Sequence, residues 1–524
     1  MSRRGIDWFA GDGFAQSEIE SAFDRGLDEA TRIQSNRHRT VHRIAAENSS
    51  RDAQPSAGFI LKTHHVATGR HPLREALKRR LGSSPARREW LALQSLLVKS
   101  VYVPRPRAWG RLEDGDEILV TEELSGTSAR DSFRAATPEE RPALADALGR
   151  TLQTLYQAGY RHGDLHLGNL FVTDDRIVLL DLQKARPLKN SNERLHDLAT
   201  LELSLARAGW SLDERSAFRA PLEPTAHFES ALRRFLQDHV RGRARRRHRV
   251  GRDWAAAEFD GLRGLREQSL SLDSLREIIQ SADRNPSPRQ RRNGRIHLTE
   301  ANTGDRVVVV KRVESRGLRR ALGDQIRGTS GKRAFHKGQR ASLLGDRAAR
   351  PLAYVEERRL GLALRSWLVI ERVGEIDLDC ITPESPELAR RIALALGAWL
   401  AEAHSWGLSH RDLKAGNVRM TIRDTSIDFW LIDLEDLTGP TNLTDDARRH
   451  SLSQLNASLS DEAFGLDARR EALEAYLAHV PFKAEKSDAA GIAAQIARQS
   501  LARGHRWRGI GCDLSRHRQD DQDE

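Results

Sequence analysis

One pattern of residues occurs twice in this chain and constrains its fold more than any other feature. The two copies are His162-Gly-Asp164-Leu-His-Leu-Gly-Asn169 and His410-Arg-Asp412-Leu-Lys414-Ala-Gly-Asn417. A short apolar run that ends in an acid follows each copy, at Asp181 and at Asp433. Kinase-type phosphoryl transfer needs this order, because an Asp deprotonates a hydroxyl while a later Asn and Asp hold a metal ion. Two copies in one chain indicate two sites of this kind.

The repeat extends beyond the loops. Lys62 and Lys311 each close an apolar run, and they precede their loops by almost the same number of residues. Aliphatic residues at helical spacing precede each loop, over 143–159 and 388–407. Related helical segments also follow each second acid. Because a repeat of this size redefines the domain count, we predict two domains of one ancestry.

The predicted boundaries follow from length and composition. A chain of 524 residues is too long for one core. A Pro- and Arg-rich stretch predicts a linker at 285–294. We therefore expect an N-terminal extension over 1–35, a first domain over 36–284 and a second over 295–524.

Each domain is expected to begin with a small sheet. Apolar and polar residues in strand-like runs predict two neighbouring strands near the start of each domain. The predicted strands are 40–47 and 58–62 in the first domain, and 295–301 and 305–311 in the second. With the helical segments that follow, this gives an α+β fold class.

Charge and cysteine content narrow the setting. The net charge is +11, and a dense basic run lies at 241–252. That run fits a solvated helix face or contact with an anionic membrane surface. No nucleic-acid module accompanies it, so nucleic acid is not expected as a partner. The two cysteines exclude a disulfide framework, and no signal peptide or membrane-spanning segment is evident. We expect a cytoplasmic protein, with peripheral membrane contact as a further option.

The two copies differ at one position that matters for the lysine. A buried ammonium beside phosphates is normally positioned by a helix carboxylate. Glu89, in a predicted helix after Lys62, is the candidate partner in the first half. The matching position in the second half is Ala334, so Lys311 is expected to lack this partner.

These residues resemble a known family. The strand Lys, the A-R-R-E-W helix start, the V-P-R-P segment and the Y-R-H-G-D-L-H-L-G-N loop are similar to the lipopolysaccharide core kinases of the Kdo/WaaP type. The resemblance implies two tandem protein-kinase-like bilobal domains that transfer the γ-phosphoryl group of ATP to a sugar hydroxyl of the lipopolysaccharide inner core (Kdo or heptose). It implies Mg²⁺ or Mn²⁺ as cofactor and a glycolipid or sugar acceptor. By the resemblance, the catalytic bases are Asp164 and Asp412, the metal ligands are Asn169, Asp181, Asn417 and Asp433, and the phosphate contacts are Lys62 and Lys311.

Three alternatives stay open. Lys414 lies where protein Ser/Thr kinases place a lysine that contacts the γ-phosphate, although the segment after Asp433 is short for binding a peptide. A small-molecule phosphotransferase would share that short segment. A pseudokinase, in which one half regulates the other, would explain the missing carboxylate opposite Lys311.

Overall fold

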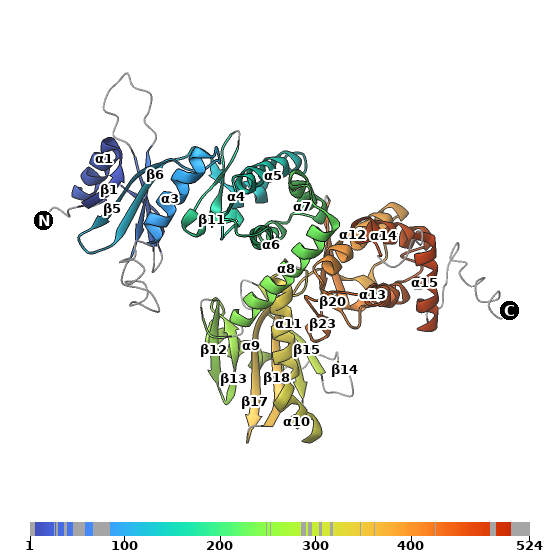
Figure 1. Cartoon of the computed structure of the whole chain (residues 1–524). Helices are drawn as coiled ribbons and strands as arrows, with labels where there is room; N and C mark the ends of the chain where they lie inside the picture. The colour runs from blue at the N-terminus through green and yellow to red at the C-terminus, as the bar shows by residue number, and fades with distance from the viewer. Residues whose placement is uncertain are drawn as a thin grey trace. The chain divides into compact units, whose positions relative to one another are not determined.

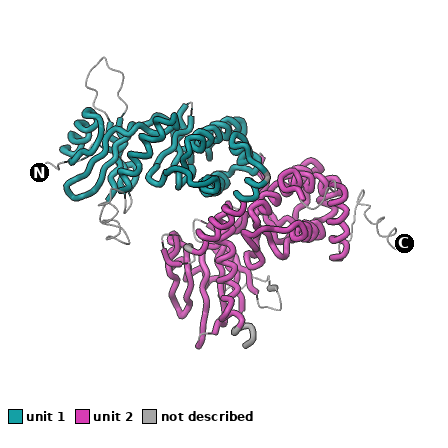
Figure 2. The backbone as a smooth tube through the Cα atoms, in the orientation of Figure 1, with its two compact units in different colours: residues 1–232 teal, residues 233–524 magenta. Residues whose placement is uncertain are grey.

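The chain divides into two compact units, residues 1–232 and 233–524 (Figure 2). The structure is a computed structural model. It describes residues 6–25, 27, 30–35, 39–45, 58–65, 84–174, 176–247, 249–251, 253–284, 290–291, 296–302, 306–314, 318–345, 347–360, 362–424, 426–482 and 489–504.

The first unit begins with a six-stranded antiparallel sheet (Figure 1). Its strand order is β1-β5-β6-β4-β3-β2. The strands are β1 Ile6–Gly11, β2 Thr31–Ser35, β3 Arg39–Ile44, β4 Phe59–His64, β5 Pro106–Leu112 and β6 Glu117–Glu122. Buried aliphatic residues of β4 and β6 pack with α1 (Gly13–Asp24) and form the core of this sheet.

Helix α3 (Pro85–Val98) lies beside this sheet, and its start follows from local chemistry. Ser84 caps the helix by accepting a hydrogen bond from the Arg87 N–H at 3.2 Å. Its buried residues recur at helical spacing and include Glu89 and Trp90. The helix therefore carries a buried carboxylate on the same face as its apolar residues.

The rest of the first unit is mainly helical. Its helices are α4 Ala129–Ala135, α5 Arg141–Gln157, α6 Asn192–Arg207, α7 Leu212–Arg219 and the first part of α8 Ala226–Arg247. Short strands and 3₁₀ turns carry the loop between α5 and α6: β8 Tyr160–Arg161, η1 Leu167–Asn169, β9 Leu170–Val172, β10 Ile177–Leu179, η2 Leu182–Lys184 and β11 Arg186–Pro187. This loop region contains the candidate site residues Asp164, Asn169 and Asp181.

The second unit repeats the plan with one more strand. Its sheet has the order β12-β13-β17-β18-β16-β15-β14. The strands are β12 Trp254–Phe259, β13 Leu262–Glu267, β14 Gln290–Arg291, β15 Ile296–Asn302, β16 Val307–Glu314, β17 Pro351–Arg359 and β18 Leu362–Glu371. The helices are α9 Leu272–Arg284, α10 Leu318–Arg327, α11 Ser330–Ser342, α12 Pro386–Ser405, α13 Asp445–Ser458, α14 Leu466–His479 and α15 Ala489–Ala502. The loop between α12 and α13 carries β20 Ser409–His410, η5 Ala415–Asn417, β21 Val418–Ile422, β22 Ile427–Leu431, η6 Leu434–Asp436 and β23 Leu437–Thr438.

The strand orders show where each repeat begins. The order β1-β5-β6-β4-β3-β2 matches β13-β17-β18-β16-β15-β14 strand for strand. Each first strand is followed by a helix, α1 after β1 and α9 after β13. The described part of the predicted N-terminal extension therefore contributes β1, α1 and β2 to the first unit, and 254–284 belongs to the second unit.

The predicted linker at 285–294 does not coincide with the division between the units. Most of it lies outside the described residues, but β14 falls within it and pairs with β15 at the edge of the second sheet. The hairpin β12–β13 pairs with β17, and α9 packs against the same core. These contacts place 254–284 in the second unit. The sequence predicts this segment to be part of the first domain, because no motif there indicates the start of a unit.

Other expectations are confirmed where the structure describes them. The predicted strands correspond to β3, β4, β15 and β16, and the predicted amphipathic helices correspond to α5 and α12. The mixed helix and sheet content is confirmed. Among the described residues, no helix combines the length and apolarity needed to cross a bilayer.

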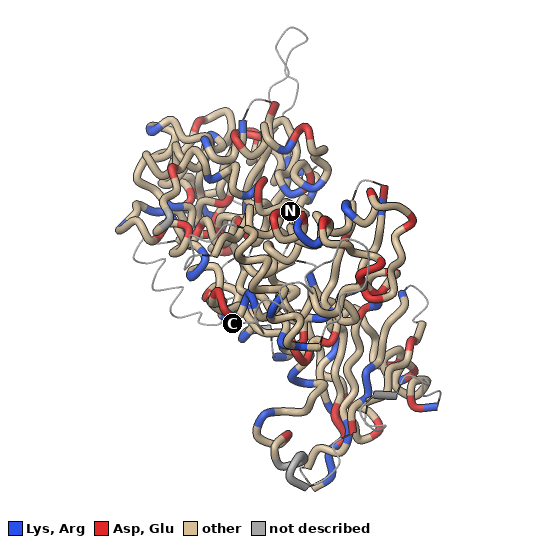
Figure 3. The backbone as a smooth tube through the Cα atoms, turned by 90° about the vertical axis from the view of Figure 1, so that its right-hand side faces the viewer, with Lys and Arg blue, Asp and Glu red and all other residues tan. Residues whose placement is uncertain are grey.

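The basic run at 241–252 is partly structural. Its first residues continue α8, and Arg241 donates two hydrogen bonds to the carbonyl oxygen of Pro440, at 3.2 and 2.8 Å. Among the residues that the structure describes, Lys and Arg are interspersed with Asp and Glu (Figure 3).

Candidate active site

The loop from His162 to Asn169 is held by its histidine. The Nε2 atom of His162 lies 2.9 Å from the carbonyl oxygen of Leu180, and Nδ1 accepts from the Asp164 N–H at 3.3 Å. Burial lowers the pKa of His162, which favours the neutral ring that this pair of contacts requires. Asn169 Nδ2 donates to the Asp164 carbonyl oxygen at 2.9 Å. The backbone of Asp164 is thereby fixed on a short, internally bonded loop.

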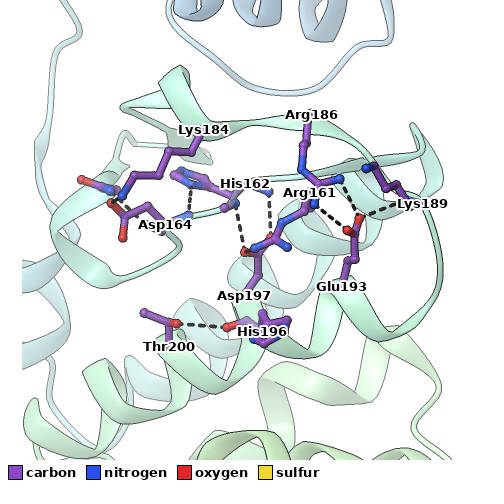
Figure 4. Close-up of polar contacts among 12 residues, drawn as sticks. Arg161, His162, Asp164, Lys184, Arg186, Lys189, Glu193, His196, Asp197 and Thr200 are labelled. Atoms are coloured by element: carbon purple, nitrogen blue, oxygen red, sulfur yellow. Dashed lines mark hydrogen bonds and ion pairs between the residues drawn. The ribbon is translucent and has the colours of Figure 1, made fainter. Parts of the chain in front are cut away.

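A buried acid on α6 supports the same loop from below. Asp197 is 1% exposed and accepts from the backbone N–H groups of His162 at 2.7 Å and Gly163 at 2.9 Å. Arg161 adds an ion pair at 3.3 Å. Figure 4 shows the Asp197 carboxylate directed at these groups. Burial raises the pKa of Asp197, so the bonds to the loop act against the cost of burying its charge.

The sheet contributes a lysine with a partner. Lys62 of β4 pairs with Glu89 of α3 at 2.5 Å, and Glu89 is 1% exposed. The predicted ion pair between strand and helix is therefore present in the first unit. Because both groups are largely buried, the position of the ammonium is well defined.

Asp181 lies close to this lysine. It follows β10 with a left-handed backbone (φ 58°) and pairs with Arg39 at 2.9 Å. Burial alone would raise its pKa, but the positive charges of Lys62 and Arg39 outweigh burial and hold the pKa of Asp181 below its ordinary value. A carboxylate that stays ionised in this position can bind a cation.

The second unit repeats the loop geometry. His410 Nε2 lies 3.1 Å from the Ile432 carbonyl oxygen, and Asn417 Nδ2 donates to the Asp412 carbonyl oxygen at 2.7 Å. Asp433 has the same left-handed backbone as its counterpart, with φ 57°. The predicted loop residues therefore occupy equivalent places in the two units.

The lysine of the second sheet is paired differently. Ala334 stands five residues after the cap Thr329, as Glu89 stands five residues after Ser84, so the predicted loss of the helix carboxylate is confirmed. Lys311 instead pairs with Asp433 at 2.6 Å. One of the predicted metal ligands of this unit thus holds the lysine directly.

A further carboxylate lies beside this pair. Glu435 accepts from Ser330 at 2.5 Å and from Arg333 at 2.6 Å, both on α11. Burial would raise its pKa, but these hydrogen bonds and the charge of Lys311 lower it. In the second unit the acid near the lysine comes from the segment after β22.

The second loop is supported differently. Ser451 occupies the place of Asp197, and its hydroxyl lies 3.1 Å from that of Ser409. The Arg411 N–H, which is equivalent to that of Gly163, donates to the carbonyl oxygen of Asp436 at 2.9 Å. Gln454 contacts the loop through both ends of its amide, because Oε1 accepts from the Leu413 N–H at 3.3 Å and Nε2 donates to the Arg411 carbonyl oxygen at 2.9 Å. Neutral groups therefore stand where the first unit has a buried carboxylate.

Each catalytic-type Asp faces a lysine, but from a different position in the chain. Lys184 Nζ donates to Asp164 Oδ2 at 2.6 Å, as Figure 4 shows. Lys414 Nζ donates to Asp412 Oδ2 at 2.7 Å. Lys414 lies on the loop itself, whereas Lys184 lies in the 3₁₀ turn after Asp181.

The sequence pattern missed several residues of this site. It contained the loop Asp and Asn residues, the acids after the strands, and both lysines, and the structure gathers these within each unit. It missed Arg39, Asp197, Lys184 and Glu435. Asp197 had a signal, an acid inside the helix that both halves share, whereas Arg39 had none.

Comparisons with known proteins identify relatives of this chain. A model of the "Lipopolysaccharide kinase (Kdo/WaaP) family" matches residues 42–220 and 279–476. The lipopolysaccharide core heptose(I) kinase WaaP of Pseudomonas aeruginosa is 24% identical over 263 residues, which span 44% of this chain and 97% of that protein. A solved structure described as WaaP in complex with acyl carrier protein has 19% identity and a TM-score of 0.33, and it covers 44% of this chain and 97% of its own.

Proposed function

Because the chain belongs to the lipopolysaccharide kinase (Kdo/WaaP) family and is a kinase, we propose that it transfers the γ-phosphoryl group of ATP to a sugar hydroxyl of the lipopolysaccharide inner core. The acceptor sugar would be Kdo or heptose. We further propose that the two units are tandem protein-kinase-like domains, each with a sheet lobe and a helical lobe.

One feature carries this proposal. In both units, a backbone hydrogen bond ties the loop Asn to the residue just before the second acid. The bonds are Leu180 N to Asn169 O at 2.8 Å and Ile432 N to Asn417 O at 2.9 Å. They bring the two candidate metal ligands together beside the loop Asp, which is the geometry that phosphoryl transfer requires.

The donor set of the first unit fits a hard divalent cation. Asn169 uses its Nδ2 for the Asp164 carbonyl oxygen, which leaves Oδ1 as a ligand. Asp181 supplies an ionised carboxylate. Oxygen ligands in small number suit Mg²⁺, which keeps several waters. When bound, Mg²⁺ or Mn²⁺ would neutralise charge on the phosphates of ATP.

The proton and the phosphoryl group are handled by different residues. Asp164 would accept the proton of the sugar hydroxyl as its oxygen bonds to the γ-phosphorus. The bond from that phosphorus to the β-γ bridging oxygen breaks, and ADP leaves. Lys62, fixed by Glu89, would contact the phosphates. Positioned charge supplies most of the rate enhancement in this chemistry.

We propose that the first unit performs most of the turnover. It retains both supports, Glu89 for its lysine and Asp197 for its loop. The second unit has Ala334 and Ser451 at these places. Its lysine pairs with Asp433, so this ion pair must rearrange before both groups can serve ATP and metal. The second unit would then act more slowly or on another hydroxyl.

The alternative acceptors fit less well. Helix α6 begins at Asn192 and α13 at Asp445, so few residues follow Asp181 and Asp433 before the next helix. A protein kinase needs a longer segment there to bind a peptide. We propose a glycolipid or sugar acceptor at the inner face of the cytoplasmic membrane, with the remaining basic residues of 241–252 near anionic lipid.

The test is phosphate transfer from labelled ATP to purified core oligosaccharides that lack phosphate on Kdo or on heptose. We expect labelled sugar in the presence of Mg²⁺, and none from the Asp164→Asn/Asp412→Asn double variant. Transfer to protein substrates but not to any core oligosaccharide would refute the proposed acceptor. Unchanged sugar transfer by the double variant would refute the proposed site.

A further inference from the structure

The two units place the same charge at the same carboxylate oxygen by different routes. Two residues after the loop Asp, the second unit has Lys414 and the first has His166. Three residues after the strand-end acid, the first unit has Lys184 and the second has Asp436. The lysine is thus exchanged between two positions, and both arrangements end 2.6–2.7 Å from Oδ2 of the catalytic Asp.

His166 does not replace the missing loop lysine. Its Nδ1 accepts from the Gly168 N–H at 3.0 Å and caps the 3₁₀ turn η1. Burial lowers the pKa of His166, which favours a neutral ring. The positive charge at Asp164 therefore comes from Lys184.

The backbone is shaped for the approach of Lys184. Gly163 has φ +83°, a conformation that side chains rarely adopt. A Cβ atom at this position would lie 2.6 Å from the Lys184 carbonyl oxygen. Glycine at this point in the loop permits the 3₁₀ turn η2 to pass directly beside Asp164.

The contact contributes little to folding. The side chains of Lys184 and Asp164 are 55% and 37% exposed. Exposed ion pairs of this kind add little to the stability of a protein, because water screens both charges. A strong effect of Lys184 on turnover would therefore report on the reaction and not on the fold.

We propose that Lys184 is the positioning residue of the first active site, holding the Asp164 carboxylate in the orientation that Lys414 gives to Asp412 in the second. This inference rests on the proposed kinase function. It assigns a role to a lysine outside the loop motif. This lysine is needed because His166 stands in place of a loop lysine, and it can reach Asp164 because Gly163 leaves room for η2.

The test uses the full chain with Asp412→Asn, so that turnover comes from the first unit. Lys184→Met removes the charge, Lys184→Arg retains it, and Lys184→Met/His166→Lys returns it from the loop position. Lys189→Met is the matched control, because Lys189 is exposed, lies in the following segment, and contacts Glu193 through its backbone N–H.

We expect Lys184→Met to lower kcat about ten- to hundredfold with the KM for ATP changed less than about twofold, since orientation of the base is lost while ATP binding stays. Lys184→Arg should retain most of the activity, and Lys189→Met should match the parent. The double variant Lys184→Met/His166→Lys should have a kcat at least about tenfold above that of Lys184→Met. All variants should melt near the parent temperature.

The inference is overturned if Lys184→Met keeps the parent kcat or if Lys184→Arg is as slow as Lys184→Met. It is also overturned if Lys184→Met/His166→Lys has the same kcat as Lys184→Met. Loss of all turnover in Asp412→Asn alone also overturns it, because the first unit would then be idle. The proposed function would fail separately, if the parent chain transferred no phosphate to any core oligosaccharide. Full activity of the Asp164→Asn/Asp412→Asn variant would instead refute the proposed site.

Discussion

Replacing Asp197 with serine gives the first unit the residue that the second unit has. The carboxylate accepts from two backbone N–H groups of the loop and from Arg161. Serine has one short oxygen, so at least one buried N–H loses its acceptor, at a cost of about 1–3 kcal/mol. Release of a charge that burial disfavours returns part of this. We expect the native conformation of the loop to be destabilised by about 2 kcal/mol. If this whole free energy is added to the activation barrier through displacement of Asp164, turnover should be about thirtyfold slower.

The assay is ATP turnover with a core oligosaccharide acceptor, measured in the Asp412→Asn chain with and without Asp197→Ser. Asp146→Ser is the control. Asp146 pairs with Arg150 on the surface of α5, where both side chains are more than half exposed, so its loss should change stability by less than about 0.5 kcal/mol. Hydrogen exchange of the His162 and Gly163 amides would report the loop directly.

The reasoning would be refuted by Asp197→Ser turnover within twofold of the parent while those two amides exchange faster. That result would mean that the loop does not need its buried acceptor to place Asp164. Slower turnover with unchanged amide exchange would refute it as well, because the effect would then arise elsewhere.

Four further outcomes are expected. Turnover should stop in excess EDTA and return with Mg²⁺ or Mn²⁺; activity that persists without metal would contradict the Asn and Asp ligands. Asp164→Asn should lower the rate by about 10² or more and Asp412→Asn by less, with single-variant assays on one acceptor as the measurement. Burial, with a contribution from Arg448, lowers the pKa of His404 to about 3, so below pH 6.5 the unfolded chain takes up a proton that the folded chain does not. The free energy of unfolding of the second unit should therefore fall by about 1.4 kcal/mol for each pH unit below 6.5. Urea titrations at several pH values should show that this free energy depends less on pH in His404→Gln. A fragment that begins at residue 295 should be insoluble because it lacks β12, β13 and α9, whereas one that begins near 250 should be soluble.

The sequence predicted the parts of the site that lie in one short motif. Asp164 and Asn169 are joined by a hydrogen bond across five residues, so their spacing alone indicated their geometry. The Lys62–Glu89 pair was also predictable, because a strand lysine and a helix acid have defined places in this chemistry. Ala334 followed from the same alignment.

The parts that were missed depend on tertiary contacts. Lys184 meets Asp164 across 20 residues, and Asp197 meets His162 across 35. A separation of 20 or 35 residues along the chain does not determine the distance between two side chains in space. The domain boundary was missed for a similar reason, because β13 is defined by its pairing with β17, which lies far along the chain. The Pro- and Arg-rich composition predicted a division at 285–294, whereas the compact units divide at residues 232 and 233.

The extra strand of the second unit changes how the two sheets end. In the first sheet, β1 is one of the two terminal strands, and a terminal strand offers backbone groups to which another chain can pair. Its register with β5 shifts between Trp8 and Ala10, and it carries Asp7. Such irregularity and charge discourage edge-to-edge association. In the second sheet, β12 covers the equivalent edge of β13. The duplicated chain thus ends one sheet at an irregular, charged strand, and in the other sheet it moves the equivalent edge outward from β13 to β12.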